Sequence, residues 1–455
     1  MRNRALWVAG AVLCAGAALR IGLAIGISEV PPVGDQLYYL HAAASLARGD
    51  GIDYRKPHWA GTQWPPGQPA FLSLFARPDA QPGPGWAPDV YARQFDLRAA
   101  RIATALLSVI ALGLLVELGR RCFDLHTGLV AGALVSVYPN AVAMSHIFNV
   151  ESNFLLLLVL AMLAAVWAND PDTAAPRPLR YALAGVAFGA AALVRSIALP
   201  LALPFALRAL LGRGSWRLRA LACAALVAGL LAALAPWTVR NALRYDRFLL
   251  LDTSVGESMY LGNNDFPPMS TDHRLFRRAS GGRPRCRLPN PADNFNCEVR
   301  AGLAHIAAHP GLFASRVVKR FVALANPSSL LVSHAHRGHY GSGASRRRVI
   351  VALAAGSFTL LAAAAILGIA GSRITPDRLA LLASIAVALA IPATMQAEVR
   401  YRLPALPAAS LFAAWALLHA RLALSRLRHP ARALVAALGC AWLAAGWIGY
   451  GWTLW

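Results

Sequence analysis

The segment ALWVAGAVLCAGAALRIGLAIGI (Ala5–Ile27) is an uninterrupted apolar run. It is long enough to cross a bilayer as a helix, which takes about 20 residues. Arg2 and Arg4 precede it, and basic residues hold a flanking segment on the cytoplasmic side. A signal peptide is the alternative, but the run is long for one and no clear cleavage motif follows. We therefore expect a retained first membrane span.

Similar apolar runs recur along the rest of the chain. The whole sequence is 57% hydrophobic and only 14% charged, with a mean hydropathy of +0.48. We predict an all-α polytopic membrane protein with about eleven spans, within a range of roughly ten to thirteen. Besides the first, the expected spans are 99–119, 128–144, 151–167, 181–194, 197–211, 220–235, 349–370, 379–395, 404–418 and 433–450.

The formal charge of +23 is explained by basic turns between spans, since cytoplasmic loops of membrane proteins are rich in arginine. Nucleic-acid binding is the other reading of such a charge, but no zinc-finger, RNP or helix-turn-helix pattern supports it. With an odd number of spans, the two ends of the chain face opposite sides. One basic segment, Ser345–Arg348 (SRRR), does not follow the positive-inside rule, because this topology places it outside. The turns assigned to the cytoplasm contain Arg120, Arg121, Arg177, Arg180, Arg213, Arg217, Arg219, Arg373, Arg378, Arg426, Arg428 and Arg432.

Two long polar segments are expected on the outer face. They divide the chain into a transmembrane core, 1–235, which includes a first outer loop at 28–98, a large outer loop at 236–348, and C-terminal spans at 349–455. The large loop contains a helical candidate at Glu298–Pro327, which either lies on the membrane surface or packs under the loop. Cys286 and Cys297 share the loop and could form a disulfide in an oxidising compartment.

Several charged residues lie where predicted spans meet the outer face. Charges at membrane depth are costly and usually functional. By the predicted topology they converge on one polar cavity, although a single ion pair there could be merely interfacial. The group consists of Asp35, Glu151, Arg195, Arg240, Glu398, Arg400 and Arg402.

This combination suits chemistry on a lipid phosphate. A carboxylate can accept the proton of a hydroxyl nucleophile, and arginines can hold and neutralise a phosphate. The sequence contains no nucleotide-binding loop of the Walker type and no HExxH motif. His334, His336 and His339 (HAHRGH) could ligate a metal, but solvated loop histidines are the commoner explanation.

The outer segments resemble those of C-type membrane glycosyltransferases, specifically bacterial relatives of protein O-mannosyltransferases and of the lipid A aminoarabinose transferase. The pattern GDQLYYLHAAASLARGDG…TQWPPGQPAFLSL is similar to their first outer loop. NVESNF, ALVRSIALP, PWTVRN and EVRYRLP are similar to later stretches, in the same order. Within the first loop the matching residues are Asp35, Tyr38, Gly49, Pro65, Pro66 and Gly67.

The resemblance implies a helical bundle with surface helices on its outer loops. It implies that Asp35 is the catalytic base. It also implies substrate contacts from Tyr38, Glu151, Arg195, Arg240, Arg400 and Tyr401. Two departures are Gln36, where many members have Glu, and Gln63-Trp64, where aminoarabinose transferases have a lysine.

The implied activity is inverting transfer of a hexose or pentose from a polyprenyl phosphate to a glycan, lipid or protein acceptor. The expected location is the outer face of a bacterial cytoplasmic membrane, with membrane lipids as surroundings and no nucleic-acid partner. No cofactor is predicted, and a divalent metal is left open. The alternatives are a lipid-linked glycan transporter or flippase, and a non-catalytic envelope-assembly protein.

Overall fold

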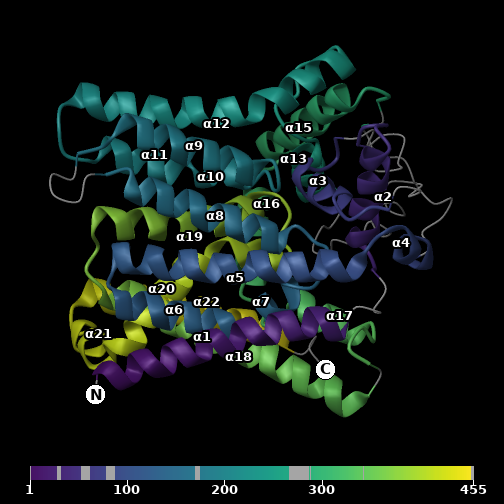
Figure 1. Cartoon of the computed structure of the whole chain (residues 1–455). Helices are drawn as coiled ribbons and strands as arrows, with labels where there is room; N and C mark the ends of the chain where they lie inside the picture. Colours follow the sequence, from purple (N-terminus) through teal and green to yellow (C-terminus); the bar gives the residue numbers. More distant parts are fainter. Residues whose placement is uncertain are drawn as a thin grey trace.

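The computed structural model describes residues 2–27, 32–52, 62–77, 88–169, 175–265, 286, 288–341 and 343–451. These residues form a bundle of helices running side by side (Figure 1). Apart from two isolated bridges they contain no strand, so the prediction of an all-α protein is confirmed. The predicted outer loops 28–98 and 236–348 lie partly outside the described residues, as do the side chains of Arg2 and Arg4.

Among the described residues, seven helical segments are long and apolar enough to cross a membrane. They are α1 (Arg2–Gly26), α5 (Leu97–Cys122), α12 (Trp216–Tyr245), α18 (Ala344–Gly371), α19 (Pro376–Thr394), η1 with α20 (Val399–Ala405 and Leu406–Leu418), and α22 (Pro430–Tyr450). Shorter helices contact them: α6 (Leu125–Val137), α8 (Glu151–Trp167), α9 (Pro178–Ala192), α10 (Ala198–Leu201) and α11 (Leu203–Leu210). All eleven predicted apolar runs are therefore helical, while the number of actual spans stays a prediction.

The helices begin where the sequence supplies side-chain caps. The side chains of Asp96, Asp124, Ser215 and Thr375 each accept a hydrogen bond from the backbone N–H three residues later, at the starts of α5, α6, α12 and α19. Such caps satisfy N–H groups that have no partner inside the helix.

Small residues let the helices approach one another closely. A Cβ added to Gly185 of α9 would lie 1.9 Å from the Leu226 carbonyl oxygen of α12, and one added to Gly229 would lie 2.0 Å from that of Ala182. Without side chains at these positions the two backbones pack directly together, as is usual between membrane helices.

A buried charge in α1 is fully partnered. Arg20 donates to the Ser108 hydroxyl of α5 and to the carbonyl oxygens of Val135 and Ser136 at the end of α6. An arginine inside an apolar bundle needs such acceptors. The contacts tie α1 to the α5–α6 pair.

The two ends of the bundle differ. The turns that carry most of the predicted cytoplasmic arginines, with α21 (Ala420–Arg426), lie at the left in Figure 1. The short helices gather at the right, which is also where the C-terminus lies, opposite the N-terminus. These are α2 (Asp35–Ala47), α3 (Gly67–Ser73), α4 (Pro88–Gln94), α13 (Ser254–Gly262), α15 (Pro291–Ala308) and α17 (Leu330–His336).

Three predicted helices differ from the structure. The run at 128–144 is divided at Tyr138 into α6 and α7 (Pro139–Met144). α12 continues through Pro236 to Tyr245, about three turns beyond the predicted end at Ala235. The single helix expected at Glu298–Pro327 is broken, because Pro310 disfavours helical backbone at His309 and starts a new helix, α16 (Pro310–Ala323).

Candidate functional site

A cavity of about 650 Å³ lies where the short helices meet the bundle. Its walls come from α2, the 62–66 segment, the start of α8, the break between α9 and α10, α13, the end of α19, and η1. One part of the wall is apolar and includes Ile197, Leu199, Pro200, Ile391, Pro392 and Met395. The charged lining residues are Asp35, Glu151, Arg195, Glu257, Glu398 and Arg400. Most of the outer charges predicted from the sequence thus share one cavity.

Asp35 is the first residue of α2 and points to Arg400. The preceding Gly34 has φ 59° and ψ −130°, a conformation that favours glycine, which lets the chain turn directly into the helix. The Arg400 Nη1 donates to the Asp35 Oδ2 at 2.6 Å, and a second pair joins the Arg400 Nε to the Glu398 Oε2 at 2.7 Å. One guanidinium therefore serves two carboxylates.

The three residues Arg400–Arg402 contact two different parts of the protein. They lie in η1, a 3₁₀ helix, in which residues two apart point in different directions. Arg400 and Tyr401 line the cavity. Arg402 instead donates to the carbonyl oxygens of Leu324, Asn326 and Ser328, and so fixes the segment between α16 and α17.

Glu151 and Arg195 form the second charged group of the cavity. Glu151 is the first residue of α8, and Arg195 lies in the break between α9 and α10, as the split apolar run predicts. Their Oε1 and Nη1 atoms are 3.5 Å apart, and the side chains are 2% and 16% exposed. Neither the Arg195 Nη1 nor the Glu151 Oε2 makes a hydrogen bond among the described residues. The pair retains buried polar atoms that a ligand could satisfy.

Aromatic side chains form the wall beside Asp35. The ring centroid of Trp64 lies 5.5 Å from that of Tyr38 and 5.4 Å from that of Tyr39. Burial, followed by the charges of Asp35 and Glu151, raises the pKa of Tyr39. Tyr39 is therefore a neutral phenol at this wall.

Sequence reasoning missed Glu257 of α13, which lines the cavity. Gln63 Nε2 donates to its carboxylate, and the Thr253 hydroxyl donates to the Gln63 Oε1 at 3.1 Å. Gln63, at the departure from the aminoarabinose pattern, thus positions an acid of the cavity. Nothing local marks Glu257, because it lies inside a long polar segment rather than at the end of an apolar run.

Arg240 is not brought into the cavity, contrary to the prediction. Because α12 continues past Pro236, Arg240 lies along its last turns. There its Nη1 donates to the Asn241 Oδ1 at 2.9 Å and to the Tyr245 hydroxyl at 3.3 Å, and its guanidinium lies 4.5 Å from the Trp237 ring centroid.

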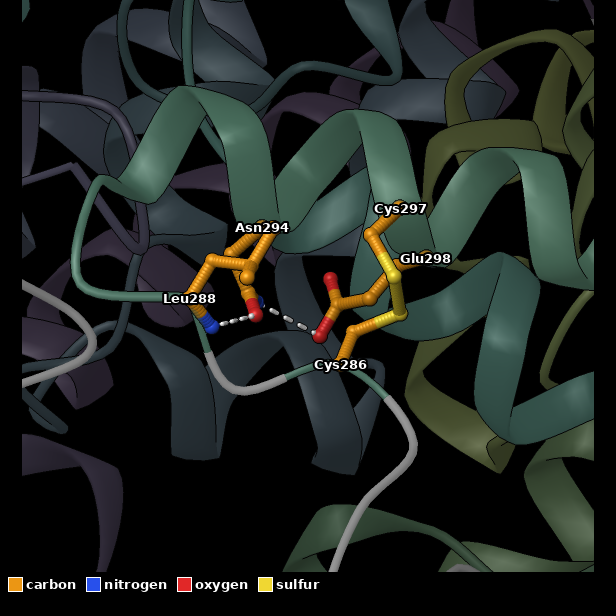
Figure 2. Close-up of a disulfide and its surroundings, with 5 residues drawn as sticks. All are labelled: Cys286, Leu288, Asn294, Cys297 and Glu298. Carbon is orange, nitrogen blue, oxygen red and sulfur yellow. Dashed lines mark hydrogen bonds between the residues drawn. A yellow bond between two sulfur atoms is a disulfide. The ribbon is translucent and has the colours of Figure 1, made fainter.

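A disulfide joins Cys286 to Cys297 of α15 (Figure 2). Beside it, the Asn294 side chain accepts from the Leu288 N–H and donates to the Glu298 Oε1 at 2.9 Å. Burial, together with the charge of Glu257, raises the pKa of Glu298 from 4.5 to about 8. The cystine-linked segment thus lies next to α13, the helix that supplies Glu257.

The predicted solvated histidines are not all exposed. His334 is 3% exposed, and its ring centroid lies 4.9 Å from that of His339. Burial, followed by nearby positive groups, lowers the pKa of His334 to about 4. His334 is thus a neutral, packed side chain.

The fold is similar to that of C-type (GT-C) membrane glycosyltransferases. The structure is similar to oligosaccharyltransferase AglB from Archaeoglobus fulgidus in complex with an inhibitory peptide and a dolichol-phosphate, with TM-score 0.51 and 14% identity. The match covers 97% of this chain and 55% of the archaeal one. The chain therefore spans about half the length of that enzyme.

Residues 90–239 match the family model of dolichyl-phosphate-mannose-protein mannosyltransferases. The predicted resemblance to C-type glycosyltransferases is thereby confirmed. The structure of ArnT from Cupriavidus metallidurans bound to undecaprenyl phosphate is also matched, with TM-score 0.41, 15% identity, and coverage of 93% of this chain and 78% of that one. The comparison with curated proteins returned no match.

Proposed function

We propose that this multi-pass membrane protein is an inverting glycosyltransferase that takes its sugar from a polyprenyl phosphate. The observation that carries the proposal is the contact of Asp35 with Arg400 at the wall of a cavity that also has an apolar side. That combination provides a base, a phosphate ligand and room for a lipid chain in one place. The family match to dolichyl-phosphate-mannose-dependent enzymes supports the same donor class.

In the proposed reaction, Asp35 accepts the proton of the acceptor hydroxyl as its oxygen attacks the anomeric carbon. The bond between that carbon and the phosphate oxygen breaks, and the lipid phosphate departs with the electron pair. Arg400 and Arg195 stabilise the charge that develops on the phosphate. Attack opposite the leaving group inverts the anomeric configuration.

Arg400 has two roles in this scheme. In the free protein its guanidinium holds the Asp35 carboxylate and Glu398. A lipid phosphate would compete for the same N–H groups, so binding of the sugar donor would loosen Arg400 from Asp35 and free that carboxylate to contact the acceptor hydroxyl.

The location that fits this donor is the outer face of a bacterial cytoplasmic membrane. Sugars on polyprenyl phosphates are used where nucleotide sugars are absent. The cavity also lies at the end of the bundle away from the basic turns, which the positive-inside rule assigns to the cytoplasm.

The test is transfer of a radiolabelled sugar in proteoliposomes. Polyprenyl phosphates carrying mannose, glucose or a pentose are each supplied with envelope fractions as acceptors, and label in the acceptor is counted. Asp35→Asn should lower transfer by about 10³-fold or more, because the base is lost while the side-chain shape is kept. Asp50→Asn is the matched control, since Asp50 is exposed and pairs with Arg48 outside the cavity.

Transfer by a folded Asp35→Asn variant at the normal rate would overturn the role of Asp35. A flippase would instead move the lipid-linked sugar across the bilayer with its bond to phosphate intact. If every sugar donor is recovered intact and moves across the bilayer, the transporter proposal would replace the enzyme proposal.

A further inference from the structure

A second group of potential metal ligands lies away from the cavity, where α13, α15 and α16 meet. It consists of Asp265, three residues after the end of α13, of His305 in the last turn of α15, and of His309 between α15 and α16. One ligand atom from each residue lies within 4.8 Å of the others. The His305 Nε2 and the Asp265 Oδ1 are 3.5 Å apart.

His305 is the anchor of this group. Its side chain is only 9% exposed, and both ring nitrogens are buried without a hydrogen-bond partner among the described residues. A buried imidazole normally has a partner for each nitrogen. Both ring nitrogens of His305 are therefore available to a ligand.

The local sequence explains why the ligands face the same way. His305 and His309 are four residues apart, which places them on one side of the helix end. Pro310 ends α15 directly after the second histidine. Asp265 and His309 are exposed, so their side chains can turn by about an ångström without disturbing packed neighbours.

Arg316 is the neighbouring charge that opposes a cation. Its Nη1 donates to the Asn264 carbonyl oxygen at 2.9 Å. Asp265 offsets part of its charge. The cluster therefore combines one carboxylate and two imidazoles, with one guanidinium nearby.

We propose that Asp265, His305 and His309 bind one divalent transition-metal ion, with zinc the ion that this ligand set suits best. Two imidazoles and a carboxylate are common zinc ligands, and the fourth tetrahedral position is open to water. The ion would join the end of α13 to the α15–α16 corner. Because α13 carries Glu257, a bound metal would stabilise one wall of the cavity without touching the reacting groups.

The test is zinc binding by the full-length protein in detergent, purified through a tag without histidine and stripped with a chelator. Competition with a chromophoric chelator should give one zinc per chain, with a Kd of about 10 μM or tighter. Cobalt substitution should give the visible absorption of a four-coordinate site. Replacing His305 or His309 by alanine should weaken zinc binding at least about tenfold.

Two further variants make the result decisive. Asp265→Asn changes an exposed side chain, so it should fold normally and still weaken binding. His429→Ala removes an exposed histidine elsewhere in the chain and should leave binding unchanged. Absence of zinc binding at about 100 μM, or undiminished binding in the folded Asp265→Asn variant, would overturn the site.

Discussion

At the scale of single residues, the cavity is lined by more carboxylates than arginines. Four carboxylates and two guanidiniums line it, and Arg400 alone contacts two of the acids. A phosphate that binds Arg400 has to compete with these two carboxylates for its donors. Arg402, two residues along the chain, plays no such part, because it donates to backbone carbonyls and its guanidinium lies 3.6 Å from the Phe358 ring centroid.

Because Arg400 contacts cavity carboxylates and Arg402 contacts backbone carbonyls, replacing each by lysine should affect a different property. Arg400→Lys should weaken binding of undecaprenyl phosphate by about tenfold, since lysine cannot hold a phosphate through two parallel N–H groups. Arg402→Lys should instead lower the free energy of unfolding by about 2–3 kcal/mol, because buried carbonyls lose donors. Lipid binding and thermal melting in detergent are measured for both. Equal effects on the two readouts would contradict the division.

Glu298 predicts a pH dependence of stability. Its pKa is about 8 in the folded protein and about 4.5 when unfolded, so between these values the folded state holds a proton that the unfolded state has released. The free energy of unfolding should therefore fall as pH rises from about 4.5 to 8, by at most about 1.4 kcal/mol per pH unit. Above pH 8 this contribution is constant.

Chemical unfolding of the detergent-solubilised protein across this pH range measures the slope. Glu298→Gln should flatten it, while Asp293→Asn, an exposed change on the same helix, should not. A slope that persists unchanged in Glu298→Gln would show that another group carries it.

At the scale of elements, the site depends on where helices break and on how closely they pack. The interruption between α9 and α10 places Arg195 at the cavity, and the short η1 separates Arg400 from Arg402. Behind them, α9 and α12 pack backbone to backbone through Gly185 and Gly229. That contact supports the helix end that carries Arg195.

Gly185→Ala should therefore destabilise the protein. The new methyl group would lie 1.9 Å from the Leu226 carbonyl oxygen, so the helices must separate, at a cost of about 1–3 kcal/mol. Gly113→Ala in α5 is the matched control, because nothing lies within 4 Å of the added atom, and it should gain about 0.5–1 kcal/mol of helix stability. Thermal melting in detergent compares them, and a Gly185→Ala protein as stable as the control would refute the close contact.

At the scale of the whole molecule, the two ends of the bundle differ in charge and in architecture. Most of the arginine-rich turns lie at one end, and the short helices with the cavity lie at the other. The positive-inside rule assigns the first end to the cytoplasm. The SRRR sequence at Ser345–Arg348 breaks the pattern, because it starts α18 at the cavity end.

Labelling by a membrane-impermeant maleimide in intact cells tests this orientation. In a background with the four free cysteines replaced by alanine, Ser345→Cys should be labelled from outside, since the residue is exposed at the cavity end. Ser425→Cys, exposed at the other end in α21, should react only after the cells are opened. The reverse pattern would invert the topology and place the cavity in the cytoplasm.

The sequence by itself determined the helical membrane class, the eleven apolar helical runs and the gathering of most outer charges. These follow from run length, local charge and the position of helix breaks, all of which are read along the chain. Only the tertiary structure decided that Asp35 contacts Arg400, 365 positions away. It also decided that Glu257 joins the cavity while Arg240 does not. Such pairings depend on how helices pack and rotate, which no local property of the sequence encodes.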